Sequence, residues 1–178
     1  MSDADLDIAI PGVIDGMRYT RQGQACTAGS RVYIQEKIYE KVLGGVVDKL
    51  KNLKMGNALD ENSDIGAIIS KEQLDRTLHY MNIAKENSST KVLHGGNQKK
   101  EGDYKDGFFY EPTLLSGVPV ESPVCQEEIF GPVACAIPFK SFDEVLKSAN
   151  NTPFGLSAVL WTQNLSRALQ FVEEIEAG

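Results

Sequence analysis

Apolar patterns typical of strands and of helices alternate along this chain, and the alternation limits its fold more than any other feature. Short apolar runs predict strands over residues 32–35, 91–93, 108–115, 132–139 and 156–161. Apolar residues at helical spacing, or a serine able to cap, predict helices over residues 10–19, 36–53, 70–85, 141–149 and 165–175. Such alternation is typical of layered α/β proteins, so we predict a largely parallel sheet flanked by helices.

Local signals refine some of these elements. Pro11 is tolerable only near the start of its helix, because proline lacks the backbone donor that an interior turn needs. Ser70, with Gln73 three residues later, predicts a capped helix start, and Ser141 predicts another. Residues 57–65 are expected to form a polar loop, and the charged, glycine-containing residues 97–107 a mobile surface turn.

Length and charge exclude several classes of protein. A chain of 178 residues suits one domain with a real hydrophobic core. Its net charge of −7 argues against nucleic acid or an anionic membrane surface as a partner, because both need a basic surface. The sequence shows no signal peptide, and no apolar stretch approaches the roughly 20 residues of a membrane helix. We therefore expect a cytoplasmic protein whose thiols stay reduced.

The cysteines and histidines do not suggest a metal site. Cys26, Cys125 and Cys135 show no paired spacing and no even count, and the two histidines lie far apart from each other. We expect neither a disulfide framework nor bound metal from this pattern. Cys125 and Cys135 are expected to be small buried hydrophobic residues.

Cys26 differs from the other two cysteines in its surroundings. It lies in Gly23-Gln24-Ala25-Cys26-Thr27-Ala28-Gly29-Ser30-Arg31, a stretch of small residues just before a predicted strand. A thiol acts as a nucleophile when substrate reaches it and when backbone N–H groups stabilise the oxyanion that forms. The small neighbours give that access, although a lone cysteine in such a loop is also compatible with an inert thiol.

This stretch resembles the nucleophile motif of the NAD(P)-dependent aldehyde dehydrogenase superfamily. A second segment, Glu127-Glu128-Ile129-Phe130-Gly131-Pro132-Val133, resembles another signature of that family, in the family's order and at about its spacing. Residues 2–7, 107–113 and 150–156 are also similar to family segments, so the resemblance covers essentially the whole chain. It implies the catalytic-domain fold of that family, with an α/β sheet.

The resemblance also implies roles for particular residues. Cys26 would attack the aldehyde carbon, a hydride would pass to NAD or NADP, and water would release a carboxylic acid. Glu128 would bind the ribose on the nicotinamide side of the cofactor, and Phe130 would limit where the nicotinamide ring sits. Residue patterns alone leave other interpretations open: a surface or salt-bridged carboxylate for Glu128 and core packing for Phe130.

The chain also departs from the family pattern. It has no match to the family's general-base glutamate, to the asparagine that donates to the oxyanion, to the phosphate-binding segment or to the oligomerisation strands. Residues 1–178 are therefore expected to be a partial, truncated catalytic domain, inactive as a dehydrogenase by itself. Apolar surface left uncovered in this way predicts self-association or a homo-oligomer.

Alternatives remain for the function. An acylating or phosphate-linked relative would use the same cysteine thioester, although the Glu127–Val133 match favours the hydrolytic branch. A non-catalytic subunit or interaction module is the alternative outside enzymes. The substrate is expected to be a small-molecule aldehyde, and the sequence does not distinguish small, aromatic and amino aldehydes. Arg18, Tyr19 and Arg21 either shape its pocket or lie on the surface of the preceding helix.

Overall fold

A mostly parallel sheet forms the centre of the molecule, as the alternating pattern predicted. The computed structural model describes residues 1–178, and its main sheet has four strands in the order β1–β6–β5–β2. These strands are β1 (Arg31–Gln35), β2 (Lys91–His94), β5 (Thr113–Ser116) and β6 (Val133–Phe139). Strands β1 and β5 run parallel to β6, whereas β2 pairs antiparallel with β5.

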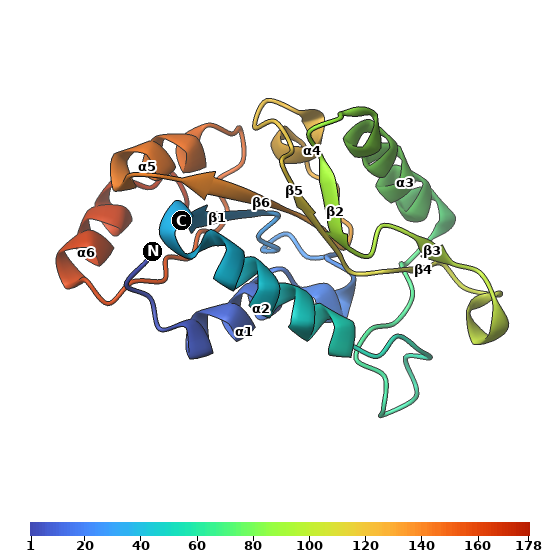
Figure 1. Ribbon diagram of the computed structural model, residues 1–178. Helices are drawn as coiled ribbons and strands as arrows, with labels where there is room; N and C mark the ends of the chain where they lie inside the picture. Colours follow the sequence, from blue (N-terminus) through green and yellow to red (C-terminus); the bar gives the residue numbers. More distant parts are fainter.

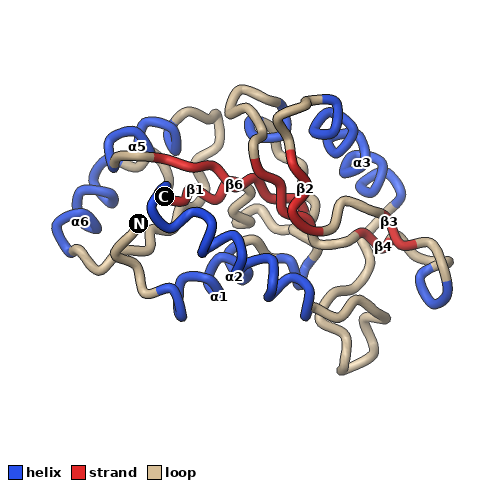
Figure 2. The backbone as a smooth tube through the Cα atoms, in the orientation of Figure 1, coloured by secondary structure: helices blue, strands red, loops and turns tan.

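Helices cover both faces of this sheet (Figure 1). One face carries α1 (Leu6–Gly16) and α2 (Tyr39–Asn52), and the other carries α3 (Lys71–Glu86) and the short α4 (Pro123–Gln126). Helices α5 (Phe142–Asn150) and α6 (Leu165–Glu174) lie together at the end where β6 finishes (Figures 1 and 2). Single 3₁₀ turns lie at η1 (Tyr19–Arg21), η2 (Glu36–Ile38) and η3 (Gly102–Tyr104). None of the helices combines the length and apolar character that crossing a membrane requires.

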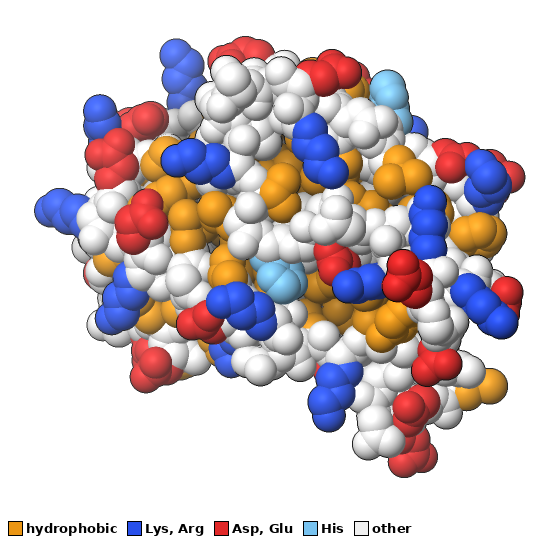
Figure 3. All heavy atoms as spheres, turned by 45° about the vertical axis from the view of Figure 1, so that its right-hand side comes forward, with side chains coloured by type: hydrophobic (Ala, Val, Ile, Leu, Met, Phe, Trp, Pro, Cys, Tyr) orange, Lys and Arg blue, Asp and Glu red, His pale blue; other side chains and the backbone are white.

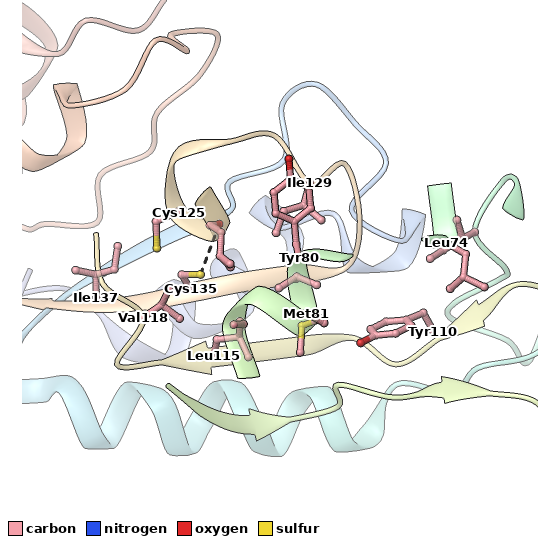
Figure 4. Close-up of a cluster of buried hydrophobic side chains, with 14 residues drawn as sticks. Leu74, Tyr80, Met81, Tyr110, Leu115, Val118, Cys125, Ile129, Cys135 and Ile137 are labelled. Atoms are coloured by element: carbon pink, nitrogen blue, oxygen red, sulfur yellow. Dashed lines mark hydrogen bonds between the residues drawn. The ribbon is translucent and has the colours of Figure 1, made fainter. Parts of the chain in front are cut away.

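Two hydrophobic clusters hold the layers together, one on each face of the sheet. Successive strand residues point to opposite faces, so Leu114 belongs to the cluster under α1 and α2 while Leu115 belongs to the one under α3. The α3 side contains Tyr80, Met81 and Cys135 (Figure 4). On the outer surface, charged side chains of both signs are scattered rather than gathered into one patch (Figure 3).

The predicted helix caps are present. The Ser70 hydroxyl accepts from the Gln73 N–H at the start of α3. Ser141 and Glu144 form a reciprocal capping box at the start of α5, which satisfies two backbone donors that the helix cannot pair internally. Within α2, Gly45 faces Ile10 so closely that a Cβ would lie 2.6 Å from the Ile10 Cδ1 atom, so this glycine allows α1 and α2 to pack.

Two predicted segments are wrong in their details. The first helix begins at Leu6 rather than Ile10, because Asp5 caps it by accepting from the Asp7 N–H, and Pro11 therefore lies inside the helix. Residues 97–107 lie on the surface as predicted, but they form a hairpin with the residues that follow rather than a turn alone. There β3 (Gln98–Lys99) pairs with β4 (Phe109–Tyr110), and the Tyr104 hydroxyl donates to the Met55 carbonyl at 3.0 Å.

The strand predicted over residues 156–161 is absent. Strands exist only as ladders with a neighbour, and no other segment of the 178 residues pairs with this one. No residue from 147 to 178 is buried. This C-terminal part is attached instead through the N-terminus: the Met1 amino group donates to the Trp161 carbonyl, and Asp3 pairs with Arg167 at 3.2 Å.

Candidate active site

Cys26 lies at the tip of a loop with an unusual backbone path. After α1, Arg18, Gln22 and Gly23 all adopt positive φ, a conformation that is uncommon for residues other than glycine. A turn follows in which the Ala28 N–H donates to the Ala25 carbonyl, with Cys26 and Thr27 at its centre. The Gly29 N–H then donates to the Gly16 carbonyl and closes the loop onto the end of α1. The thiol of Cys26 is consequently exposed.

Side chains that precede the tip in the sequence anchor this loop. The Tyr19 hydroxyl donates to the Thr113 carbonyl at 2.9 Å, and Gln22 Nε2 donates to the Gly66 carbonyl at 2.7 Å. Gln24 Oε1 accepts from the Ile69 N–H at 3.0 Å. Burial raises the pKa of Tyr19 well above its usual range, so its hydroxyl stays a neutral donor.

These anchors were not found from the sequence. Both interpretations of Tyr19, as a pocket residue or as a surface residue, are wrong, because it is fully buried against the sheet. Of its two basic neighbours, Arg18 is exposed and lines a cavity, and Arg21 is exposed. Nothing local to the sequence distinguishes Gln22 as buried, because its partners lie 44 and 88 residues away along the chain.

The two motifs meet through a glycine-to-glycine contact. A Cβ added to Gly23 would lie 2.1 Å from the Gly131 carbonyl oxygen, so only a residue without a side chain permits this approach. Gly131 itself is tightly packed, because a Cβ there would lie 2.5 Å from Thr77 Oγ1. The nucleophile loop and the Glu127–Val133 segment are therefore neighbours in space.

Cys26 and Glu128 line the same cavity, whose volume is about 690 Å³. Its walls come from the start of the chain, from the Cys26 loop and from the C-terminal part, where Leu156, Trp161 and Phe171 contribute apolar surface. Phe130 lines a separate small hollow of about 30 Å³ together with Ala25, Ala28 and Glu128. The structure thus brings all three residues predicted from the sequence, Cys26, Glu128 and Phe130, to one region of the molecule.

Phe130 and Glu128 lie on the surface of this region. Phe130 adopts a positive φ of 55° and is exposed, so its ring is not part of the core. The Glu128 side chain is also exposed and makes no salt bridge or hydrogen bond within the chain. A free carboxylate at the edge of a cavity can accept from two adjacent hydroxyl groups of a ligand.

The other two cysteines are buried, as expected. Cys125 and Cys135 both belong to the cluster beneath α3 (Figure 4). The neighbouring Cys125 thiol, together with burial, raises the pKa of Cys135. Cys125 also lines the cavity but is only 5% exposed, so Cys26 is the one exposed cysteine of the chain.

Comparison with known proteins gives a consistent match over the whole chain. The model of the aldehyde dehydrogenase family matches residues 1–178. An α-ketoglutaric semialdehyde dehydrogenase of Bacillus subtilis is 40% identical over 176 residues, covering 99% of this chain and 36% of that protein. A betaine aldehyde dehydrogenase of Mesorhizobium japonicum is 37% identical over 176 residues, with the same two coverages. The chain therefore spans about a third of the length of the curated relatives it matches.

Solved structures match equally well. An aldehyde dehydrogenase from Bacillus cereus in complex with NAD⁺ superimposes with a TM-score of 0.93 at 38% identity, covering 100% of this chain and 35% of that one. A betaine aldehyde dehydrogenase from Staphylococcus aureus in complex with NAD⁺ gives a TM-score of 0.94 at 31% identity, covering 99% and 34%. The fold described above therefore matches about one third of the chain of each of these two enzymes.

Proposed function

The chain belongs to the aldehyde dehydrogenase family, and from this premise we propose that it is the nucleophile-bearing part of a catalytic domain that oxidises an aldehyde to a carboxylic acid with NAD(P)⁺. The observation that carries the proposal is the position of Cys26, which is exposed and lines the same cavity as Glu128. Two curated relatives named for aldehyde oxidation support an aldehyde as the substrate class.

The proposed chemistry begins at the Cys26 sulfur. The thiolate adds to the aldehyde carbon, a C–S bond forms, and the carbonyl electron pair moves onto oxygen. The backbone N–H of Cys26 donates to no acceptor within the chain and is free to stabilise that oxyanion. Collapse of this thiohemiacetal expels a hydride and leaves a thioester. Water then adds to the thioester, the C–S bond breaks, and the carboxylic acid leaves with the thiol restored.

Glu128 and Phe130 are proposed to hold the hydride acceptor. Bound NAD(P)⁺ supplies a nicotinamide ring that accepts the hydride. The free Glu128 carboxylate suits the paired hydroxyls of a ribose, and the exposed Phe130 ring suits the edge of the nicotinamide. The NAD⁺ complexes of the two solved neighbours support a cofactor of this type for the family.

An assay of cofactor reduction tests the proposal. The gene product that carries these 178 residues is incubated with NAD⁺ or NADP⁺ and a set of aldehydes, and the absorbance of reduced cofactor and the acid product are followed. We expect reduced cofactor and free acid in equal amounts. Product that forms only with a thiol or phosphate acceptor would assign the chain to an acylating relative. Absence of reduced cofactor with every aldehyde would contradict the proposal.

Replacing Glu128 is expected to weaken cofactor binding. In Glu128→Ala we expect the KM for NAD⁺ to rise about 10- to 100-fold, because hydrogen bonds to a charged group contribute about 1.5–3 kcal/mol. Cys26 should keep its rate of alkylation in this variant, since the two side chains sit on different loops. Glu121→Gln, which alters an exposed carboxylate on the other side of α4, serves as the control. An unchanged KM in Glu128→Ala would remove Glu128 from the cofactor site.

The 178-residue polypeptide by itself is expected to give no turnover and to self-associate. General bases contribute about 10²–10⁴ in rate, and the family segment that supplies one has no match in this sequence. On α6, Leu165, Leu169 and Val172 are exposed at 73%, 57% and 73% on one stripe, a pattern that favours association. Clear cofactor reduction by this polypeptide would contradict the expected lack of turnover. A monomer by light scattering at tens of micromolar would contradict the expected self-association.

A further inference from the structure

One face of α3 contacts the segment that carries Glu128, although the two are far apart in sequence. Gln73, Arg76, Thr77 and Tyr80 lie on that face, because residues three, four and seven apart share one side of a helix. All four contact residues 127–131, which begin 47 residues after Tyr80. This segment lies outside the helices and strands, so its backbone groups depend on such contacts.

Gln73 makes the central contact. Its side-chain Nε2 donates to the Ile129 carbonyl at 2.9 Å and to the Phe130 carbonyl at 2.8 Å. The sequence suggested Gln73 as the reciprocal partner of Ser70 in a capping box. Only its backbone N–H serves that cap, and the amide group instead holds two successive carbonyls of the loop. Those carbonyls flank the backbone of Phe130, the residue with positive φ.

Arg76, Thr77 and Tyr80 extend the same contact along the helix. The Arg76 guanidinium donates to the Glu128 carbonyl, through Nε at 3.1 Å, and to the Ile129 carbonyl at 3.2 Å. Tyr80 donates to the Glu127 carboxylate at 2.6 Å, while Thr77 packs against Gly131. Ile129 and Tyr80 belong to one buried cluster (Figure 4). Carbonyls 128, 129 and 130 therefore all accept from α3 side chains.

We propose that Gln73, assisted by Arg76, is a positioning residue that fixes the backbone of residues 128–130 and thereby sets where Glu128 and Phe130 stand at the cavity. A residue in the left-handed region is strained, and it persists only where its surroundings hold it. The two carbonyl contacts of Gln73 supply that constraint from a rigid helix. The consequence for the cofactor rests on the function proposed above, whereas the fixing of the loop does not.

The rate of proteolysis after Glu127 and Glu128 measures directly how firmly Gln73 holds this backbone. A glutamate-specific protease cuts after Glu127 and Glu128 only when that segment opens, so the rate of cutting reports local opening. In Gln73→Glu the side chain keeps its size but loses both donors, and we expect cutting there to become at least about tenfold faster. Cutting after the exposed Glu101, in the distant hairpin, should change by less than about twofold. Gln170→Ala, on the exposed face of α6, is the matched control and should change neither rate.

The outcomes separate this inference from the proposed function. Unchanged cutting after Glu127 and Glu128 in Gln73→Glu would overturn it, as would equal acceleration at Glu101, which indicates general unfolding. Arg76→Gln provides a second variant, for which we expect a smaller acceleration confined to the same segment. In the active gene product, Gln73→Glu should raise the KM for NAD⁺ about tenfold with kcat changed by less than about threefold. Fast cutting with an unchanged KM would leave the positioning intact and count against the cofactor role of Glu128.

Discussion

In Cys26→Ser we expect aldehyde oxidation by the gene product to fall by about 10⁴-fold or more in kcat, a loss of the size seen when a catalytic nucleophile is removed. A serine hydroxyl keeps the shape of the loop tip but is a far weaker nucleophile without an adjacent base, and neither of the other cysteines can replace it. Cys135 is buried beneath α3, and Cys125, although it lines the same cavity as Cys26, is only 5% exposed. Initial rates of cofactor reduction measure the effect.

Cys135→Ala is the matched control for that experiment. It removes a buried thiol from β6, and we expect a modest loss of stability of about 1 kcal/mol with activity within about threefold of the unaltered protein. Retention of more than about a hundredth of the activity in Cys26→Ser would contradict the assignment of the nucleophile. The assignment of Cys26 as the nucleophile would also be contradicted if Cys135→Ala abolished turnover while the protein stayed folded.

Gly23→Ala is expected to lower the free energy of unfolding by about 3 kcal/mol or more, an unusually large effect for adding one methyl group. Gly23 has φ of +63°, a conformation that costs an alanine about 1–2 kcal/mol. The added Cβ would also lie 2.1 Å from the Gly131 carbonyl oxygen, which is backbone and cannot rotate away. Relief of this clash must separate the nucleophile loop from the Glu128 segment. Urea denaturation followed by circular dichroism measures the stability.

A second glycine supplies the control for this prediction. Gly44 lies exposed in α2, and a Cβ there would meet nothing within 4 Å. Gly44→Ala is therefore expected to stabilise the protein by about 0.5–1 kcal/mol, since alanine favours helix and reduces the freedom of the unfolded chain. If Gly23→Ala stayed within about 0.5 kcal/mol of the unaltered protein, the close approach of the two motifs would not hold.

Features that depend on a few neighbouring residues could be predicted from the sequence. Ser70 and Ser141 cap their helices as expected, because a cap involves residues within one turn. The parallel sheet also follows from local pattern, since strands separated by helices pair in parallel through crossovers. The strand predicted at 156–161 failed for the opposite reason. Its apolar pattern is local, but a strand requires a partner, and the sequence pattern does not reveal one.

The same distinction between local and long-range features applies to the candidate site. Resemblance in short motifs identified Cys26, Glu128 and Phe130, and the structure brings them to one region. The residues that hold this region together were not predicted. Tyr19 and Gln22 anchor the nucleophile loop to carbonyls 44 to 94 residues away, and Gln73 reaches 56 residues along the chain. Side-chain contacts with backbone over such separations leave no periodic signal, so only the folded arrangement shows them.

Trapping the covalent intermediate tests the central claim most directly. The gene product is mixed with an aldehyde and NAD(P)⁺, quenched in acid within the first turnover, digested and examined by mass spectrometry. We expect an acyl group on the peptide that contains Cys26, dependent on the oxidised cofactor and absent from the peptides that contain Cys125 and Cys135. Acid formation with no acyl group on Cys26, or with the acyl group on another residue, would contradict it.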